Sequence, residues 1–258
     1  MDSSIKLNKS KFARNTNWKN TEYQYIKNVK ITEWDIKSAG LSVIKFKKLL
    51  PDSEISKLEN MSKTMRTIRE GLFQKEFPFI AESIVKTLED VRQAFVFLNN
   101  IYEEDVLSIK KDAIFVLNKI PNTTIIKDYF TFRPKGVYTS FILLNKNEFL
   151  LSTDGSLEVK GISSESISFQ KNFLLKDITY LLKMAEKVDK QQMFTVLKNY
   201  RRKYLNMELP IETYRELDTG MFRVGEYLTN EIDSSLKSNM DISQNYMNYI
   251  LPLISMLL

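Results

Sequence analysis

The 258-residue sequence contains no cysteine and no histidine. Disulfides, thiolate or imidazole zinc sites, Ser-His-Asp triads and Cys-His pairs are therefore excluded. Carboxylates are left as the only strong metal ligands, and a site built from carboxylates takes a hard cation such as Mg²⁺ or Mn²⁺. The sequence thus predicts either hard-metal chemistry or none.

The sequence also lacks a long apolar run. No stretch approaches the roughly 18 apolar residues that a membrane-spanning helix needs, and the longest candidate, residues 249–258, is interrupted by Pro252. We interpret that segment as a docking or core segment. The polar start MDSSIKLNKSK has no signal-peptide core. These features, with the absence of cysteine, predict a protein of the cytoplasm, that of the host if a phage encodes it, with no membrane partner.

Positive charge is concentrated near the N-terminus. The net charge is +6, and the first 30 residues carry seven Lys or Arg against two acidic residues. Phe12, Trp18, Tyr23 and Tyr25 are interleaved with these cations. A basic arm of this kind, taken as residues 1–28, suits phosphates and stacked bases, but a solvated, partly disordered arm has the same composition.

The hydrophobic pattern predicts an α+β fold. Apolar and polar residues alternate over residues 28–36, as in a half-buried strand. Apolar residues three or four positions apart predict helices over 53–73 and 79–100. Two apolar runs on either side of Lys110-Lys111-Asp112 predict a tight hairpin. Further strands are expected at 123–133, 137–144, 147–152 and 156–162. From about residue 171 the pattern is helical, and a boundary is expected near 163–170.

Asp35 and Asp112 lie at the ends of two of these predicted strands. Two-metal phosphoryl transfer needs carboxylates that converge from separate chain segments, and a strand end beside a hairpin tip supplies that arrangement if both belong to one sheet. Aspartate is also a common turn residue. By themselves, the two positions therefore fit either a metal site or a structural protein in which both aspartates cap turns.

Several segments resemble family B DNA polymerases. Residues 35–42, DIKSAGLS, resemble the first palm motif of that family, in which a metal-binding aspartate is followed by serines three and seven positions later. Residues 108–116, SIKKDAIFV, resemble its second metal motif, with Asp112 in the place of the indispensable aspartate. Residues 80–101 look like the helix before this hairpin. Downstream, RPKGVY and LEVKGI are similar to strands that lead toward the thumb.

The resemblance implies a reduced polymerase. Residues 29–165 would form a palm-like domain, an antiparallel sheet backed by two helices, with a short fingers-like helix at 53–73. Residues 166–258 would form a helical thumb-like domain. The implied activity is metal-dependent, template-directed nucleotidyl transfer with two Mg²⁺ ions, or Mn²⁺. The implied partners are nucleoside triphosphates and primer–template DNA or DNA/RNA, and the apolar C-terminus is a candidate contact for a protein partner.

The resemblance also assigns roles to individual residues. Asp35 and Asp112 would be the catalytic metal ligands, with help from the Ile36 carbonyl. The candidate nucleotide-binding residues are Ser38, Gly40, Lys63, Arg66 and Arg69. The candidate nucleic-acid-binding residues are Lys110, Arg133, Lys135, Tyr138, Lys160, Lys198, Arg201 and Arg202.

Three positions depart from the family pattern. Lys110 stands where the family has a further aspartate, and Ala113 stands where it has a hydroxyl residue. Gly40 replaces an aromatic residue that blocks a ribose 2′-hydroxyl, so an active site here is expected to tolerate ribonucleotides. The changes at 110 and 113 keep an alternative open: a catalytically inactive palm-like subunit that binds nucleic acid in a phage replication or transcription complex.

Overall fold

The computed structural model describes residues 11–144, 147–160, 173–210 and 246–258. The chain divides into two compact units, residues 1–22 with 30–137 and residues 23–29 with 138–258. In this part of the chain the division falls between Val137 and Tyr138, whereas the boundary expected at 163–170 lies outside the described residues. Helices and antiparallel strands occur in both units, which agrees with the predicted α+β class.

The first unit is built on an antiparallel sheet. Its strands are, in spatial order, β1 (Asn17–Lys19), β4 (Val106–Lys110), β5 (Ala113–Leu117), β3 (Ile31–Ile36) and the first part of β7 (Phe130–Leu144), with β6 (Ile125–Ile126) also pairing with β7. Strand β4 follows the short helix η2 (Glu103–Asp105). The predicted hairpin is β4 and β5, and Lys110 pairs with Ala113 across a two-residue turn.

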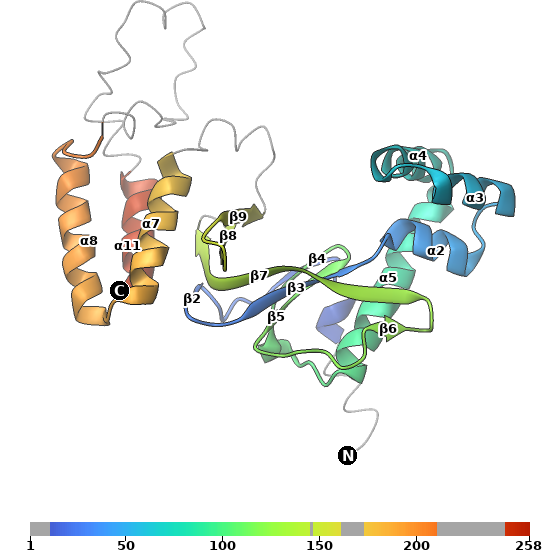
Figure 1. The fold of residues 1–258 in the computed structure, drawn as a ribbon, viewed down its shortest axis with the longest axis horizontal. Coiled ribbons are helices and arrows are strands. Elements are labelled where there is room, and N and C mark those ends of the chain that lie inside the picture. The colour runs from blue at the N-terminus through green and yellow to red at the C-terminus, as the bar shows by residue number, and fades with distance from the viewer. Residues whose placement is uncertain (1–10, 145–146, 161–172, 211–245) are drawn as a thin grey trace, which may run out of the picture. The chain divides into compact units, whose positions relative to one another are not determined.

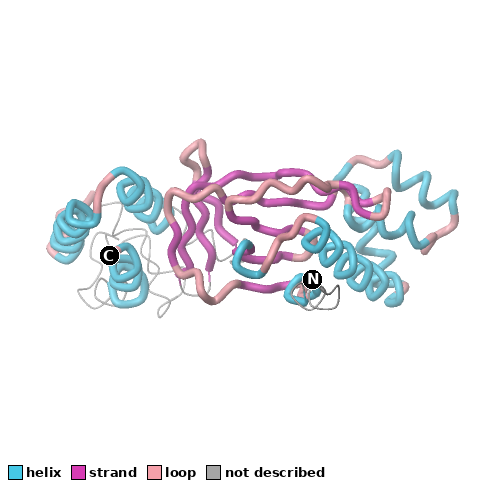
Figure 2. The backbone as a smooth tube through the Cα atoms, turned by 90° about the horizontal axis from the view of Figure 1, so that it is seen from below, coloured by secondary structure: helices cyan, strands magenta, loops and turns pink. Residues whose placement is uncertain are grey.

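Helix α5 (Pro78–Leu98) lies against one face of this sheet (Figures 1 and 2). It begins at a proline, the residue suited to a first helical position. Helices α2 (Ala39–Lys47), α3 (Asp52–Asn60) and α4 (Lys63–Glu76) gather beyond the ends of the strands, where α2 and α4 pack on α5 and α3 packs on α2 and α4. Phe95 of α5 stacks on Phe132 at 3.9 Å between ring centroids and lies 6.2 Å from Trp34. Alternate residues of β3 and β5 therefore point into the helical layer, and those between them point to the opposite face.

The prediction of one helix over residues 53–73, with its apolar face buried, is wrong in two respects. The segment forms two helices, α3 and α4, because Ser62 starts a new helix by accepting a hydrogen bond from the Met65 amide. Ile55 and Leu58 are buried, but Met65, Ile68 and Leu72 are 57%, 54% and 52% exposed. Their spacing still gives one helix face, so periodicity alone does not tell a buried stripe from an exposed one.

The N-terminal basic segment is packed where the structure describes it. Residues Lys11–Arg14 form the short helix η1, in which Phe12 and Ala13 are buried, and β1 pairs with β4. The interpretation as a solvated, partly disordered arm is therefore wrong for residues 11–28, because their apolar side chains complete the core. Phe12 lies 5.1 Å from Trp18 between ring centroids.

The second unit combines a sheet with a helical bundle. The strands are β2 (Tyr25–Ile26), the rest of β7, β8 (Asn147–Ser152) and β9 (Leu157–Lys160), all antiparallel. The helices are α7 (Phe173–Lys187), α8 (Lys190–Leu205), the π-helical turn η3 (Tyr246–Ile250) and α11 (Leu251–Leu257). Asp189 caps α8 by accepting from the Gln192 amide. Helices α7, α8 and α11 stand side by side (Figures 1 and 2).

Some expectations for the later strands and helices were wrong. The strands predicted at 123–133 and 137–144 are largely one strand, β7, because its first residues pair with β6 and its later residues with β8. Phe194 of α8 is 54% exposed although Leu197, Tyr200 and Tyr204, at helical spacing after it, are buried. The apolar C-terminal segment is a core segment, since Leu253, Ile254 and Leu257 are buried with α7 and α8. No helix among the described residues is long and apolar enough to cross a membrane.

Candidate active site

The structure brings Asp35 and Asp112 together. Asp35 pairs with Ala113 across β3 and β5, and Asp112 occupies the adjacent hairpin turn. Their side chains lie within hydrogen-bonding reach of each other. Both predicted carboxylates therefore converge from separate segments of the first unit, as two-metal chemistry requires.

The two carboxyl groups are close enough to influence each other's ionisation. Burial, the negative charge of Asp112 and a hydrogen bond between the two carboxyl groups raise the pKa of Asp35. Lys135 and Arg133 oppose this rise. Two acidic groups held this close repel when both are ionised, and a divalent cation between them removes that repulsion.

Arg92 holds the hairpin turn in place, although the sequence analysis did not single it out. Its buried guanidinium donates to the carbonyls of Ala13 at 3.1 Å, Asn15 at 3.2 Å and Lys111 at 2.5 Å. Lys111 has a left-handed φ of 55°, and its amide donates to Thr16 at 2.7 Å. The available signal was an arginine within the apolar stripe of the predicted helix at 79–100.

Cations surround the carboxylate pair on the sheet. Lys135 forms an ion pair of 2.9 Å with buried Glu33, two residues before Asp35 on the same face of β3. Arg133 is exposed and close enough to act on Asp35. Lys110 pairs with Ala113, which in turn pairs with Asp35, so its backbone lies two strand spacings from Asp35, about 10 Å. Phosphate groups would therefore meet positive charge here.

The predicted nucleotide-binding residues divide into two groups. Arg66 of α4 donates to the Ser38 hydroxyl at 3.3 Å and lies 3.8 Å from Glu70. A Cβ atom at Gly40 would come within 2.4 Å of the Glu70 carboxylate. The space beside Gly40, which the sequence analysis took to be open, is therefore occupied by Glu70, and burial raises the pKa of that carboxyl group.

Lys63 and Arg69 are placed differently from Arg66, which donates a hydrogen bond to Ser38. Arg69 lies 3.7 Å from Glu54 and its guanidinium covers the Phe73 ring at 4.5 Å. Lys63 is exposed at the start of α4. Lys63, Arg66 and Arg69 are spaced by three along the helix. Within the described part of the chain, only Arg66 of these three forms a hydrogen bond with a residue of the 35–42 motif.

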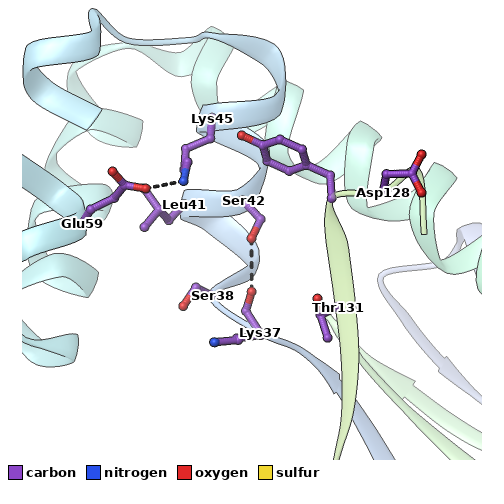
Figure 3. Close-up of a pocket in the computed structure, with 9 residues that line it drawn as sticks. Lys37, Ser38, Leu41, Ser42, Lys45, Glu59, Asp128 and Thr131 are labelled. Atoms are coloured by element: carbon purple, nitrogen blue, oxygen red, sulfur yellow. Dashed lines mark hydrogen bonds and ion pairs between the residues drawn. The ribbon is translucent and has the colours of Figure 1, made fainter. Parts of the chain in front are cut away.

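A cavity of about 560 Å³ opens beside the strand end that carries Asp35 (Figure 3). It lies between helix α2 and the segment that leads into β7. The Ser42 hydroxyl donates to the Lys37 carbonyl at 3.1 Å, and Lys45 is paired with Glu59. The lining residues are Lys37, Ser38, Leu41, Ser42, Lys45, Glu59, Asp128, Tyr129 and Thr131.

Two predicted nucleic-acid-binding residues form a network inside the second unit. Tyr138 is only 2% exposed and donates to Glu158, which also pairs with Lys160. The assignment of the Tyr138 ring to nucleic-acid contact is therefore wrong, because the ring is buried. Lys160 is partly exposed on β9 but already has a carboxylate partner.

The three cations predicted on the last long helix are exposed on α8. Arg202 makes two contacts of 2.7 Å with Glu208, and the Arg201 guanidinium lies 5.8 Å from the Tyr246 ring centroid. With Lys198 they line a groove of about 570 Å³. This basic surface belongs to the second unit.

The donor chemistry of Asp35 and Asp112 would suit Mg²⁺ or Mn²⁺, since both side chains are hard carboxylates. Ile36 supplies a backbone carbonyl next to them. Within residues 11–144, 147–160, 173–210 and 246–258, no group of three acidic side chains could hold a metal ion. Water and substrate oxygens would have to complete the coordination, which is usual for Mg²⁺.

Fold and site together define an α+β protein with a carboxylate pair at the ends of interior strands of a helix-backed antiparallel sheet. The family model described as bacteriophage PBS1 gene 130 protein matches residues 8–258. The chain therefore belongs to this family of phage proteins. No curated protein matches the chain.

Proposed function

We propose that this phage protein is a metal-dependent nucleotidyltransferase that acts on nucleic acid, in the manner of a reduced family B-like DNA polymerase. The observation that carries the proposal is the convergence of Asp35 and Asp112 on a sheet backed by helices. The amino-acid sequences around both residues resemble the palm motifs of family B DNA polymerases, and this resemblance supports the same conclusion.

The chain's own residues have separable roles in this proposal. Asp35 and Asp112 hold the divalent ions, assisted by the Ile36 carbonyl. Arg133 and Lys135 attract the phosphates of the substrate strand, because both cations already act on the Asp35 carboxylate. Arg66, next to Ser38, faces the incoming triphosphate. Arg92 is a positioning residue, since it fixes the turn that carries Asp112.

Bound divalent ions would activate the attacking 3′-hydroxyl and neutralise charge on the leaving pyrophosphate. The two carboxylates offer this chemistry at one point of the sheet. The volume beside Gly40 is filled by Glu70, a carboxylate on the tip of a flexible side chain. We therefore still expect ribonucleotides to be accepted, because such a side chain can turn away where an aromatic ring cannot.

Primer extension tests the proposal. The full chain is incubated with a primed DNA template, Mg²⁺ or Mn²⁺, and either deoxyribonucleotides or ribonucleotides. Extension is expected with the parent protein, and Asp35→Ala and Asp112→Ala should reduce it by at least about a thousandfold, as for loss of a metal ligand. Asp90→Ala, an exposed acidic residue of α5, is the matched control. Unchanged extension by either site variant would refute the assignment.

A second candidate function is a nucleic-acid-binding subunit without catalysis. It is favoured by the position of Lys110, which stands in the second metal motif in place of an acidic residue and shares a cross-strand row with Asp35. This candidate predicts salt-sensitive binding to DNA or RNA without divalent-dependent synthesis. Binding would then be the same in the parent and in Asp35→Ala.

A further inference from the structure

We infer that the cavity between α2 and the start of β7 binds the nucleoside part, base and sugar, of a single nucleotide. The inference rests on the proposed function for the identity of the substrate and deepens it by naming where the base is held. The residues that carry it are Lys37, Ser42, Tyr129 and Thr131, none of which belongs to the carboxylate pair.

The cavity adjoins the carboxylate pair along two strands. Strand β3 carries Asp35 and runs directly into Lys37, whose amide donates to the Thr131 carbonyl at 2.9 Å. Strand β7 carries Thr131 and, two residues later on the same face, Arg133, which acts on Asp35. A ligand in the cavity would thus have its phosphate end beside Arg133 and the two carboxylates.

The walls are polar and offer hydrogen bonds of the kind that sugars and base edges use. Figure 3 shows the Ser42 hydroxyl directed at the Lys37 carbonyl, with Thr131 across from them on the neighbouring strand. The Ser42 oxygen can still accept, and the exposed Thr131 hydroxyl can donate and accept. At about 560 Å³ the cavity lies within the range of small-molecule sites.

An aromatic ring provides a flat wall. Tyr129 packs against Phe46, with ring centroids 5.5 Å apart, and against Phe130 at 5.9 Å, so its ring is held in place. It nevertheless remains 40% exposed. A partly exposed ring fixed on one side is the arrangement on which a nucleobase stacks, whatever its sequence identity.

The charge balance favours the nucleoside over the triphosphate. Lys45 is already paired with Glu59, and the remaining pair of lining charges, Lys37 and Asp128, is also of opposite sign. The lining as a whole is therefore neutral. A triphosphate inside it would lack compensating charge, whereas a neutral base and sugar fit, with the phosphates outside near Arg133.

Nucleotide binding in EDTA tests the inference, because it does not require the metal. The full chain is titrated by calorimetry with each nucleoside triphosphate and, separately, with a short single-stranded oligonucleotide, so that a free nucleotide and a nucleotide within a strand are distinguished. We expect one site, a loss of affinity of about tenfold or more in Tyr129→Ala, and retention in Tyr129→Phe, which keeps the stacking ring.

A second variant and a control distinguish loss of the binding site from loss of folding. Thr131→Trp fills the cavity from an exposed strand position, where an aromatic residue is tolerated, and should also weaken binding by about tenfold or more. Tyr180→Ala removes a comparably exposed ring from α7 and should leave binding unchanged. Folding of every variant is checked by its thermal midpoint.

The outcomes separate this inference from the proposed function. If the parent binds no nucleotide, or if folded Tyr129→Ala and Thr131→Trp bind as the parent does, the inference is overturned, whether or not the protein extends primers. If both variants lose binding but the parent extends no primer, the nucleoside site stands and the nucleotidyltransferase proposal falls.

Discussion

Arg92 donates a hydrogen bond to the carbonyl of Lys111, the residue directly before Asp112. The same guanidinium binds the carbonyls of Ala13 and Asn15, so one buried cation ties helix α5, the N-terminal segment and the hairpin turn together. A buried arginine is stable only when its donors are used, because an unpaired charge in the core costs several kcal/mol. The position of Asp112 therefore depends on a buried residue from a separate helix.

Replacing Arg92 should destabilise the first unit strongly. Arg92→Leu leaves four backbone carbonyls, those of Ala13, Arg14, Asn15 and Lys111, without their donor, and we expect a loss of about 3–5 kcal/mol in the free energy of unfolding. Arg92→Lys should lose less, because it keeps one charged donor group. Urea unfolding measures both variants, with Lys86→Leu on the exposed side of α5 as the control. A parent-like midpoint for Arg92→Leu would contradict the described anchoring role.

Neutralising one carboxylate of the pair should stabilise the metal-free protein. In Asp35→Asn the repulsion between Asp35 and Asp112 is removed, and we expect a gain of about 1 kcal/mol near neutral pH in EDTA. Adding Mg²⁺ or Mn²⁺ should then raise the thermal midpoint of the parent in a concentration-dependent manner but not that of the variant, because ligands stabilise the state that binds them. Equal responses to the metal would argue against the site.

The stability of the second unit should fall as the pH rises, through Asp177. Burial raises the pKa of Asp177 to about 6, while a hydrogen bond from Tyr200 and the charge of Lys176 oppose the rise. The ordinary value is 3.8, so the folded state binds more protons than the unfolded state between these two values. This contribution is fully present below about pH 4 and is lost as the pH passes 6.

Asp177→Asn isolates that contribution. The amide stays neutral and can still accept from Tyr200, so the variant should gain about 2 kcal/mol over the parent at pH 8 and almost nothing at pH 4. Urea unfolding at both pH values gives the difference, in which the other titrating groups cancel. An advantage that is the same at both pH values would rule out the ionisation of Asp177 as its cause.

Gly40 and Glu70 should be energetically coupled. Alanine at 40 favours helix α2 by up to about 1 kcal/mol, but its Cβ would come within 2.4 Å of the Glu70 carboxylate, which must then move. In Glu70→Ala the space is free, so Gly40→Ala should stabilise more in that background than in the parent. A double-mutant cycle by urea unfolding should give a coupling of about 1 kcal/mol. Additive effects would show that the contact carries no energy.

Several features of the site followed from the sequence because their causes are local. The absence of histidine and cysteine left carboxylates as the strong metal ligands, and alternation with turn residues located β3 and the β4–β5 hairpin. Helix α5 and the buried positions of α7 follow a 3.6-residue period. For this reason Asp35 and Asp112 could be located at strand ends, whereas their assignment as a metal pair followed from the resemblance to the polymerase palm motifs.

Other features depend on contacts between distant segments, and no local pattern encodes them. The same periodicity that buries Ile84 and Leu88 in α5 leaves Met65, Ile68 and Leu72 of α4 exposed, because burial requires a packing partner. The filling of the Gly40 space by Glu70 and the burial of Tyr138 have the same kind of cause.

By itself, the sequence determined the α+β class, the strand ends that carry Asp35 and Asp112, and the hard-metal chemistry open to them. Only the tertiary structure decided that the two carboxylates meet, that Arg92 anchors the turn beside them, and that a cavity with Tyr129 in its wall opens next to the pair. The physical reason is that cross-strand register and side-chain burial are set by long-range pairing, which closes only when the whole sheet has formed.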